Sequence, residues 1–372
     1  MGLIENRIYY TYNDVTIMPS VVSDIKHRAE CIPWDNEGML PLFTAPMDTV
    51  VSEENFDLFQ QNHINAILPR TAPLDTRIWY SQTNRWAAYS LNEFAEVYCN
   101  KDKKQGNKPK VLIDVANGHM QKIIDLVKAA RKIYSDNIVI MVGNIANPRT
   151  YENLARAGVD YVRCGIGSGC GCLSTSNTGV HMPMATLISD IAKLREEIRD
   201  DYRHLPYIVA DGGIRNYSDA IKALAIGADY VMIGSVFAKM LESAAPKSCC
   251  SDDWLKLPLK TQLSDLTEFR LDNVGWYGRY EGKEVYLGDI KAKFYGMASR
   301  EGQIALSGAK TKTSEGLKKT LIVEYTMEGW TKNFIDYLRS AMSYVGAETL
   351  NIFRDKAIVI VNSPNAVNAV NK

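Results

Sequence analysis

Short apolar runs recur along the chain, and polar stretches with apolar residues at helical spacing separate many of them. Eight apolar runs have the length of strands: residues 42–45, 66–68, 86–90, 111–115, 138–142, 161–164, 207–210 and 230–233. Amphipathic helices are predicted between several of these runs, at residues 120–133, 150–157 and 218–225. Continuous apolar strands that alternate with helices are typical of a parallel sheet buried on both faces.

The number of strand-and-helix units favours a closed barrel over an open, doubly wound sheet. Gly158 and Gly227 each stand where a predicted helix gives way to the next strand, as expected of consecutive αβ units. We therefore predict one α/β domain over residues 1–372, a (β/α)8 or TIM barrel.

Three segments interrupt this pattern. Residues 71–85 and 100–109 are short and polar, and we interpret both as loops with no room for an inserted domain. Residues 248–329 show no barrel pattern, and we expect a hairpin at residues 277–287 and a mobile active-site flap in this segment. Residues 330–350 are predicted to contain a closing C-terminal helix.

The overall charge narrows the class of ligand. The 43 basic residues balance 43 acidic ones, and 46% hydrophobic with 23% charged residues is ordinary for a globular protein. Without a basic excess, we expect neither a nucleic-acid partner nor a membrane partner. A small molecule fits better, and an anionic one must be held by local hydrogen-bond donors.

The N-terminus lacks the charged and apolar layout of a signal peptide, and no apolar run is long enough to cross a bilayer. The seven cysteines are scattered and odd in number, which indicates reduced thiols. Cysteines and histidines are not spaced as zinc ligands are. We therefore expect a soluble, cytoplasmic protein.

The densest chemical signal is a glycine-rich loop at residues 164–174, directly after a predicted strand and so on the catalytic face of a barrel. Its glycines allow positive φ and expose backbone groups that can face a cation or an anion. Cys172 is a candidate nucleophile in this loop, and Ser174 offers a hydroxyl for proton transfer. A flexible loop with bystander thiols explains the composition equally well.

Glycine turns end the last two predicted strands. Asp211, Gly212 and Gly213 follow one strand, and Gly234 with Ser235 follows the other. Backbone N–H groups at these two places form the usual phosphate site of a barrel, so we favour phosphate binding over a purely structural turn. The Asp211 carboxylate can accept a bond from a ribose hydroxyl, cap a helix or be a buried structural group.

Two weaker signals lie after another strand and in the expected flap. Asp114, Val115 and Ala116 follow a strand, where contact with substrate or cofactor competes with a simple turn. Glu315 in the flap is a candidate acid or base, although an exposed loop glutamate is usually solvated. Lys312 can meet a cofactor phosphate or belong to a solvated charged loop.

From Tyr10 to about Val361, the sequence resembles the IMP dehydrogenase/GMP reductase family. The resemblance is carried by residues 165–172 and by five further motifs: Tyr12-Asn13-Asp14-Val15, Pro46-Met47-Asp48-Thr49-Val50, Thr178-Gly179-Val180, Ala210-Asp211-Gly212-Gly213-Ile214-Arg215 and Phe294-Tyr295-Gly296-Met297. It implies a (β/α)8 barrel that assembles as a homotetramer, a catalytic cysteine, a mobile flap and a covalent thioimidate at purine C2. It also implies a potassium ion held by Gly167, Gly169 and Cys172.

Two features suggest a branch of the family. Residues 70–86 leave no space for the CBS regulatory domain that the dehydrogenase branch usually inserts. The flap lacks that branch's Arg-Tyr pair, whereas Ser314-Glu315-Gly316 resembles the flap signature of the reductase branch. We therefore expect NADPH-dependent reductive deamination of GMP to IMP with release of ammonia.

Other functions remain open. One is an IMP dehydrogenase without its regulatory domain, which converts IMP to XMP with NAD, and another is a relative that acts on a different purine monophosphate. A degenerate nucleotide-binding protein is a third, because the cysteine loop departs from the family pattern. Ser168 stands where the family usually has proline, Cys170 where it has serine, and Pro69-Arg70 where the reductases have His-Lys.

The resemblance assigns roles to matching positions of this sequence. Cys172 attacks the purine, and Ser174 with Glu315 protonates the departing amine. The implied substrate-binding residues are Met47, Asp211, Gly212, Gly213, Gly234, Ser235, Gly296, Met297, Ala298, Lys312, Ser314 and Gly316. The implied cofactor-binding residues, from this or a neighbouring subunit, are Arg70, Asp114, Val115, Ala116, Ile166, Gly167, Ser340 and Ser343.

Overall fold

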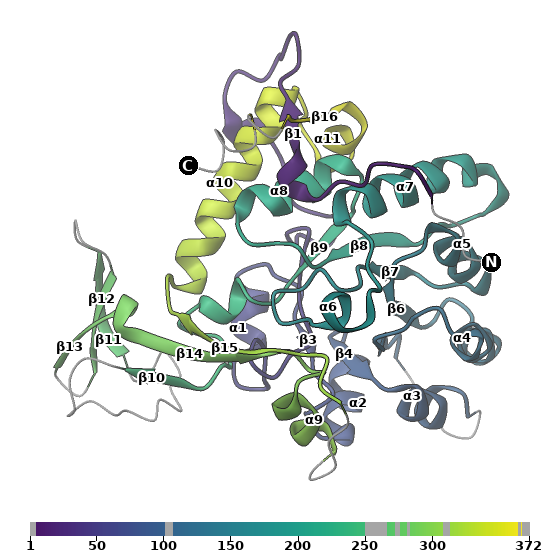
Figure 1. Cartoon of the computed structure of the whole chain (residues 1–372), viewed down its shortest axis with the longest axis horizontal. Helices are drawn as coiled ribbons and strands as arrows, with labels where there is room; N and C mark the ends of the chain where they lie inside the picture. The colour runs from purple at the N-terminus through teal and green to yellow at the C-terminus, as the bar shows by residue number, and fades with distance from the viewer. Residues whose placement is uncertain are drawn as a thin grey trace.

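An eight-stranded parallel sheet curls around the centre of the molecule, with its strands in the order β2-β9-β8-β7-β6-β5-β4-β3 (Figure 1). The computed structural model describes residues 5–100, 107–249, 266–271, 276–280, 283–307 and 313–363, together with Ala366. The strands are β2 (Leu42–Thr44), β3 (Ile67–Leu68), β4 (Trp86–Tyr89), β5 (Lys110–Asp114), β6 (Val139–Ile145), β7 (Tyr161–Cys164), β8 (Tyr207–Asp211) and β9 (Tyr230–Ile233). Each overlaps a predicted strand, so the predicted strands are confirmed.

The sheet is joined into a barrel between β2 and the residues before β3. Phe43 and Asn65 form a parallel bridge there. The Thr44 amide donates to the Asn65 carbonyl at 2.9 Å, and the Asn65 amide donates to the Leu42 carbonyl at 3.0 Å. The predicted TIM-type barrel is therefore confirmed.

A helix follows each barrel strand and packs outside the sheet (Figure 1). The helices are α1 (Phe56–Gln61), α2 (Leu74–Gln82), α3 (Leu91–Tyr98), α4 (Gln121–Tyr134), α5 (Pro148–Ala157), α7 (Met184–Glu197), α8 (Tyr217–Ile226) and α10 (Met327–Val345), with the short α6 (Ser174–Thr178) before α7. Gly158 ends α5 at φ 93° and Gly227 ends α8 at φ 126°, a backbone conformation that favours glycine. Both predicted helix ends are confirmed.

The prediction of a loop at residues 71–85 was wrong, because α2 occupies most of it. The segment is polar in sequence, yet Arg77 on this helix is only 2% exposed. Its guanidinium donates to the Ala72 and Ala88 carbonyls at 2.9 and 2.8 Å and forms an ion pair with Glu93. A buried arginine therefore takes a core position that the apolar pattern could not reveal.

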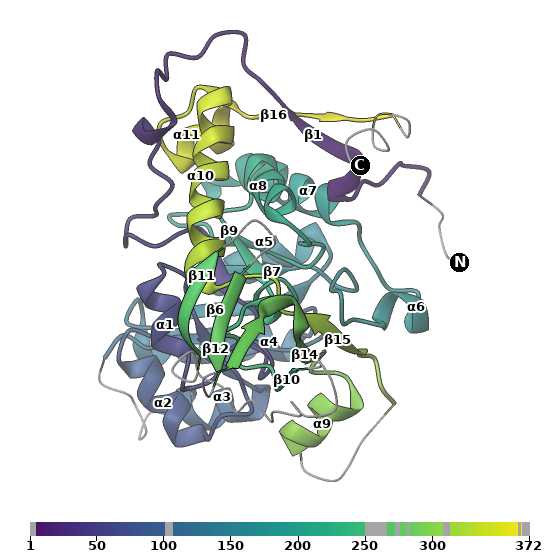
Figure 2. The same cartoon turned by 90° about the vertical axis from the view of Figure 1, so that its left-hand side faces the viewer.

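The segment after β9 adds two small antiparallel sheets beside the barrel (Figure 2). One contains β10 (Lys247–Cys249), β14 (Ile290–Tyr295) and β15 (Lys318–Ile322), and the other β11 (Leu266–Leu271), β12 (Trp276–Tyr280) and β13 (Lys283–Tyr286). The pairing of β12 with β13 confirms the predicted hairpin. Helix α9 (Arg300–Ser307) follows β14. The mobility of this flap segment stays a prediction.

Two strands near the ends of the described chain pair on one side of the barrel. Strand β1 (Val15–Met18) pairs antiparallel with β16 (Ile358–Val361), and Figure 2 shows the two side by side. Helix α11 (Leu350–Lys356) lies between α10 and β16 in the chain. The predicted C-terminal helix is confirmed as α10, and a single domain over the whole chain stays a prediction.

Aromatic side chains fill part of the barrel interior. The rings of Phe43 and Trp86 meet edge-on with their centroids 5.5 Å apart, and the centroids of Trp86 and Tyr161 are 5.1 Å apart. Tyr230 joins this cluster and donates its hydroxyl to Asp35 at 3.0 Å. These large rings close the interior to ligands, so the space for a ligand lies above them, where the strands end.

None of the described helices is long and apolar enough to cross a membrane.

Candidate active site

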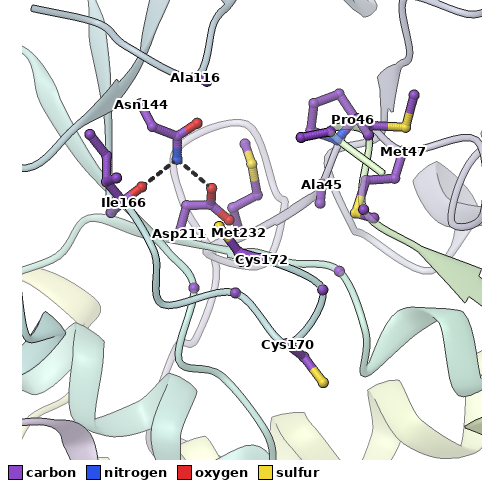
Figure 3. A pocket seen from close by; sticks show the side chains of 18 of the residues that line it. Ala45, Pro46, Met47, Ala116, Asn144, Ile166, Cys170, Cys172, Asp211 and Met232 are labelled. Carbon is purple, nitrogen blue, oxygen red and sulfur yellow. Dashed lines mark hydrogen bonds between the residues drawn. The ribbon is translucent and has the colours of Figure 1, made fainter. Parts of the chain in front are cut away.

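A cavity of about 320 Å³ opens where the barrel strands end (Figure 3). Its walls come from the segments after six strands and from the flap, which contributes Phe294, Gly296, Met297, Ala298, Leu306 and Glu315. The carboxyl ends of the strands are the catalytic face of this type of barrel. The volume lies within the range of small-molecule sites.

The glycine-rich loop after β7 lines this cavity and is tightly folded. Gly165 has φ 141°, and a Cβ there would lie 1.9 Å from the Asp211 carbonyl oxygen. The Gly213 amide donates to the Ser168 carbonyl at 2.9 Å, which ties the loop to the turn after β8. A side chain at position 165 would push these two turns apart, so glycine is required there.

The three predicted catalytic residues lie together. The Cys172 sulfur is 3.4 Å from the Ser174 hydroxyl oxygen, and that hydroxyl donates to the Glu315 carboxylate at 2.9 Å. The Ser174 amide also points at the sulfur, at 3.5 Å. A serine between a thiol and a carboxylate can pass a proton from one to the other.

Backbone pairing between the flap and the cysteine loop places Glu315. The Leu173 amide donates to the Glu315 carbonyl at 2.7 Å, and the Leu317 amide donates to the Gly171 carbonyl at 2.8 Å. Between them, Gly316 forms a bridge with Cys172. Ser314 and Gly316, predicted to bind substrate, are thus beside the site but do not line the cavity.

The predicted phosphate residues line one wall of the cavity. Gly212, Gly213, Gly234 and Ser235 are all present there, with φ of 104° and 75° at the first two. Met47 reaches this wall, because its sulfur would lie 3.3 Å from a Cβ on Gly234. The wall is therefore built from small glycine turns at the ends of two strands, the usual setting of a phosphate site in a barrel.

A charged network spans the mouth of the barrel, and its centre was not predicted. Arg163 on β7 is 8% exposed and donates to Asp211 at 2.9 Å and to Asp114 at 2.7 Å. Burial alone would lower the pKa of Arg163, but the two carboxylates outweigh it and raise the pKa above its ordinary value. Arg163 therefore stays charged and joins the predicted ribose residue to the predicted cofactor residue.

Asn144 is a second member of this network to which the sequence analysis assigned no role. Its amide nitrogen donates to Asp211 Oδ2 at 2.6 Å, as Figure 3 shows, and to the Gly165 carbonyl at 2.7 Å. Arg163 also donates to Oδ2 of Asp211. Among the hydrogen bonds of the described residues, Asp211 Oδ1 therefore stays available to a ligand. An arginine within an apolar strand was the one sequence signal for this network.

Most of the predicted cofactor residues line the cavity on the side of β5 and the cysteine loop: Arg70, Asp114, Val115, Ala116, Ile166 and Gly167. Arg70 donates to the Asp114 carbonyl at 3.3 Å. Ser340 and Ser343 lie on α10 and do not line the cavity of this chain. Arg28 donates to the Ser340 hydroxyl at 3.2 Å. Because neither serine lines this cavity, their predicted role is one toward the cofactor of a neighbouring subunit, and it stays a prediction.

The carbonyls predicted to hold potassium are already hydrogen-bonded. The Thr175 hydroxyl donates to the Gly167 carbonyl and the Cys172 amide to the Gly169 carbonyl, each at 3.0 Å. A carbonyl has a second lone pair, so these bonds are compatible with a cation. Potassium stays a prediction.

Lys312, predicted to bind substrate, lies outside the described residues.

Comparisons with known proteins agree on one family. The family model described as IMP dehydrogenase / GMP reductase domain matches residues 106–257. A GMP reductase of Caenorhabditis elegans is 24% identical and covers 97% of this chain and 94% of its own length. A GMP reductase of Latilactobacillus sakei is 28% identical and covers 86% of this chain and 96% of its own length.

An inosine-5'-monophosphate dehydrogenase of Chlorobaculum tepidum is 30% identical over 66% of this chain, but the match covers 43% of the dehydrogenase. The chain thus spans about two fifths of that relative's length and nearly the full length of the two reductases.

Proposed function

This chain belongs to the IMP dehydrogenase/GMP reductase family, and we propose on that premise that it converts GMP to IMP and ammonia with NADPH. The observation that carries this proposal is the hydrogen-bonded series of Cys172, Ser174 and Glu315 beside a phosphate-type wall. A thiol nucleophile with its own proton donor is what substitution of an amine at an electron-poor ring carbon requires.

The lining of the cavity suggests how the nucleotide is oriented. The backbone N–H of Gly234 and the hydroxyl of Ser235 bind the phosphate, with Gly213 beside them in the wall. The N–H of Gly213 itself is donated to the Ser168 carbonyl. Asp211 accepts a bond from a ribose hydroxyl through Oδ1, since Oδ2 is already taken by Arg163 and Asn144. The base then reaches toward the cysteine loop, where Cys172 lies.

The reaction proceeds through a covalent bond to the protein. The Cys172 sulfur attacks C2 of GMP, and the bond from C2 to the exocyclic nitrogen breaks. As the sulfur attacks, the proton of the Cys172 thiol passes through Ser174 to Glu315. Ser174 then gives the departing nitrogen a proton and takes that one back from Glu315, so ammonia leaves as a neutral molecule. Covalent catalysis divides one difficult substitution into two easier steps.

A nicotinamide cofactor supplies the hydride that replaces the amine at C2. The residues that would hold it line the cavity beside the nucleotide wall: Asp114, Val115, Ala116, Ile166 and Gly167. Once C2 is reduced, the bond from C2 to sulfur breaks, IMP leaves and Cys172 is free again. The proposal includes a potassium ion at the cysteine loop and a homotetramer, in which Ser340 and Ser343 reach the cofactor of a neighbouring subunit.

IMP dehydrogenase activity is the second candidate. It is favoured by the identity of 30% to the Chlorobaculum tepidum dehydrogenase, which exceeds the identity of 24% to the Caenorhabditis elegans reductase. The flap argues against it, because residues 297–315 contain no Arg-Tyr pair to activate water. Coverage argues against it too, since the dehydrogenase is matched over less than half its length.

The test is turnover of the purified chain with two substrate pairs, GMP with NADPH and IMP with NAD, followed by nicotinamide absorbance. The proposal expects NADPH oxidation with one ammonia and one IMP per turnover, and no turnover of the second pair. Turnover of IMP with NAD alone would overturn the choice of branch. Cys99→Ala is the matched control for Cys172→Ala, since Cys99 lies outside the cavity, with its thiol donating to the Leu126 carbonyl at 3.5 Å.

A further inference from the structure

A second cysteine lies in the same loop as the nucleophile and has no role in the proposed reaction. Cys170 precedes Cys172 by two residues, and both thiols are free. Cys170 is exposed and lines the rim of the cavity, while Cys172 is half-buried inside it. In Figure 3 the Cys170 side chain points away from the cavity and the Cys172 side chain points into it.

The surroundings of Cys170 are those of a reactive thiol. The Lys319 ammonium on β15 is 3.4 Å from the Cys170 sulfur. An exposed sulfur beside a positive charge is the setting in which thiols react with oxidants and with other sulfurs. The neighbouring Lys318 pairs instead with Glu301, at 3.2 Å. The flap therefore presents one of two adjacent lysines to this thiol.

The loop can bring the two sulfurs together. Two residues of chain span at most about 7 Å when extended, and a disulfide joins Cα atoms up to about 6.8 Å apart. Here the chain is already bent, because the Cys172 amide donates to the Gly169 carbonyl at 3.0 Å. A Cβ on Gly169 would meet only the Cys172 Cβ, at 3.7 Å, so there is space for the loop to rearrange.

We propose that Cys170 is a resolving cysteine, which captures an oxidised Cys172 as a disulfide. A hydroperoxide first oxidises the Cys172 sulfur to a sulfenic acid and is itself reduced to water or an alcohol. The Cys170 sulfur then attacks the Cys172 sulfur, the S–S bond forms, and the sulfenic oxygen leaves as water with the Cys170 proton. Two thiols have lost two electrons in total, and the peroxide has gained them.

The disulfide blocks the Cys172 nucleophile reversibly and protects it from further oxidation. Without Cys170, a sulfenic acid at Cys172 proceeds to sulfinic acid, which ordinary thiols do not reduce. A disulfide in so small a ring, at an exposed rim, belongs to the strained class that cellular reductants open readily. The enzyme would therefore stop under oxidant and resume afterwards. This consequence for activity rests on the proposed function, whereas the disulfide itself does not.

The test is peptide mass after hydrogen peroxide treatment, followed by denaturation and alkylation. Trypsin releases residues 164–193 as one peptide with three cysteines, Cys164, Cys170 and Cys172. The proposal expects loss of two hydrogens and alkylation at Cys164 alone, since that thiol is fully buried in the folded chain. Reductant should restore all three alkylations and most of the original turnover.

Cys170→Ser provides the discriminating comparison. We expect it to turn over like the wild type before oxidation, and to gain sulfinic acid at Cys172 after it with no recovery by reductant. Lys319→Gln should slow disulfide formation about eightfold, the effect of one unit charge at this distance in water, and Lys318→Gln should not. Wild-type chain with sulfinic acid at Cys172 and an alkylated Cys170 would overturn the proposal. A disulfide in a chain that turns over no purine would instead refute the proposed function alone.

Discussion

Ser174→Ala separates the serine's role in proton transfer from the cysteine's role as nucleophile. The substitution removes the hydroxyl that lies 3.4 Å from the Cys172 sulfur and 2.9 Å from the Glu315 carboxylate. It leaves the Ser174 backbone carbonyl in place, which accepts a bond from Thr178 at 2.6 Å. The loop and the short α6 should therefore keep their fold.

The size of the effect follows from the position of the hydroxyl. Loss of a positioned proton donor typically lowers a rate by about 10²–10⁴-fold. Ser174 is half-buried beside an open cavity, so water can replace the hydroxyl in part. We expect a fall in kcat of about 10²–10³-fold, or about 3–4 kcal/mol of barrier, with KM for GMP changed by less than about threefold.

The assay is steady-state turnover of GMP with NADPH, together with the mass of the quenched protein. The Cys172 adduct should still form in Ser174→Ala, because the nucleophile is intact, while ammonia release slows. Ser174→Thr is the matched control and should keep turnover near wild type, since its hydroxyl can take the same place. A Ser174→Ala variant with kcat within about threefold of wild type would refute the proton-relay role.

Two further substitutions test the charged groups of the structure. Arg163→Met leaves Asp114 and Asp211 without their shared cation. In urea titrations it should lower the free energy of unfolding by about 3 kcal/mol. An unchanged midpoint of unfolding would contradict a stabilising role for the network. Burial raises the pKa of Glu242 from 4.5 to about 7. Between these two pH values the carboxyl of the folded chain therefore keeps a proton that the unfolded chain has released. Its contribution to stability should therefore fall as pH rises from about 4.5 to about 7 and level off above that. Glu242→Gln should flatten this part of the curve of unfolding free energy against pH, and a variant with the wild-type slope would contradict the assignment.

The barrel was predictable because buried parallel strands are continuous apolar runs. Strands β7 and β9 have the predicted bounds, since each is a short run preceded by a glycine-containing turn and apolar except for Arg163 in β7. Helix α2 was missed for the opposite reason, because its core position is occupied by Arg77. An apolar pattern cannot distinguish a buried arginine with three partners from one in solvent.

The site was predictable to different degrees. Cys172 and Ser174 are two residues apart and were found from the loop itself. Glu315, 141 residues from Ser174 in sequence, was a candidate acid or base of the flap, and only the family resemblance paired it with Ser174. The role of Arg163 depends on three strands meeting at the barrel mouth, a relation that exists only in the folded chain. The Ser340 prediction depends on a neighbouring subunit, which one chain does not contain.

The most direct test of the central claim is the mass of the Cys172 peptide after rapid quenching of the protein during turnover of GMP with NADPH. We expect a purine adduct on residues 164–193 of the wild type and of Cys99→Ala, and neither adduct nor turnover in Cys172→Ala. Turnover of Cys172→Ala at the wild-type rate would contradict covalent catalysis by this cysteine.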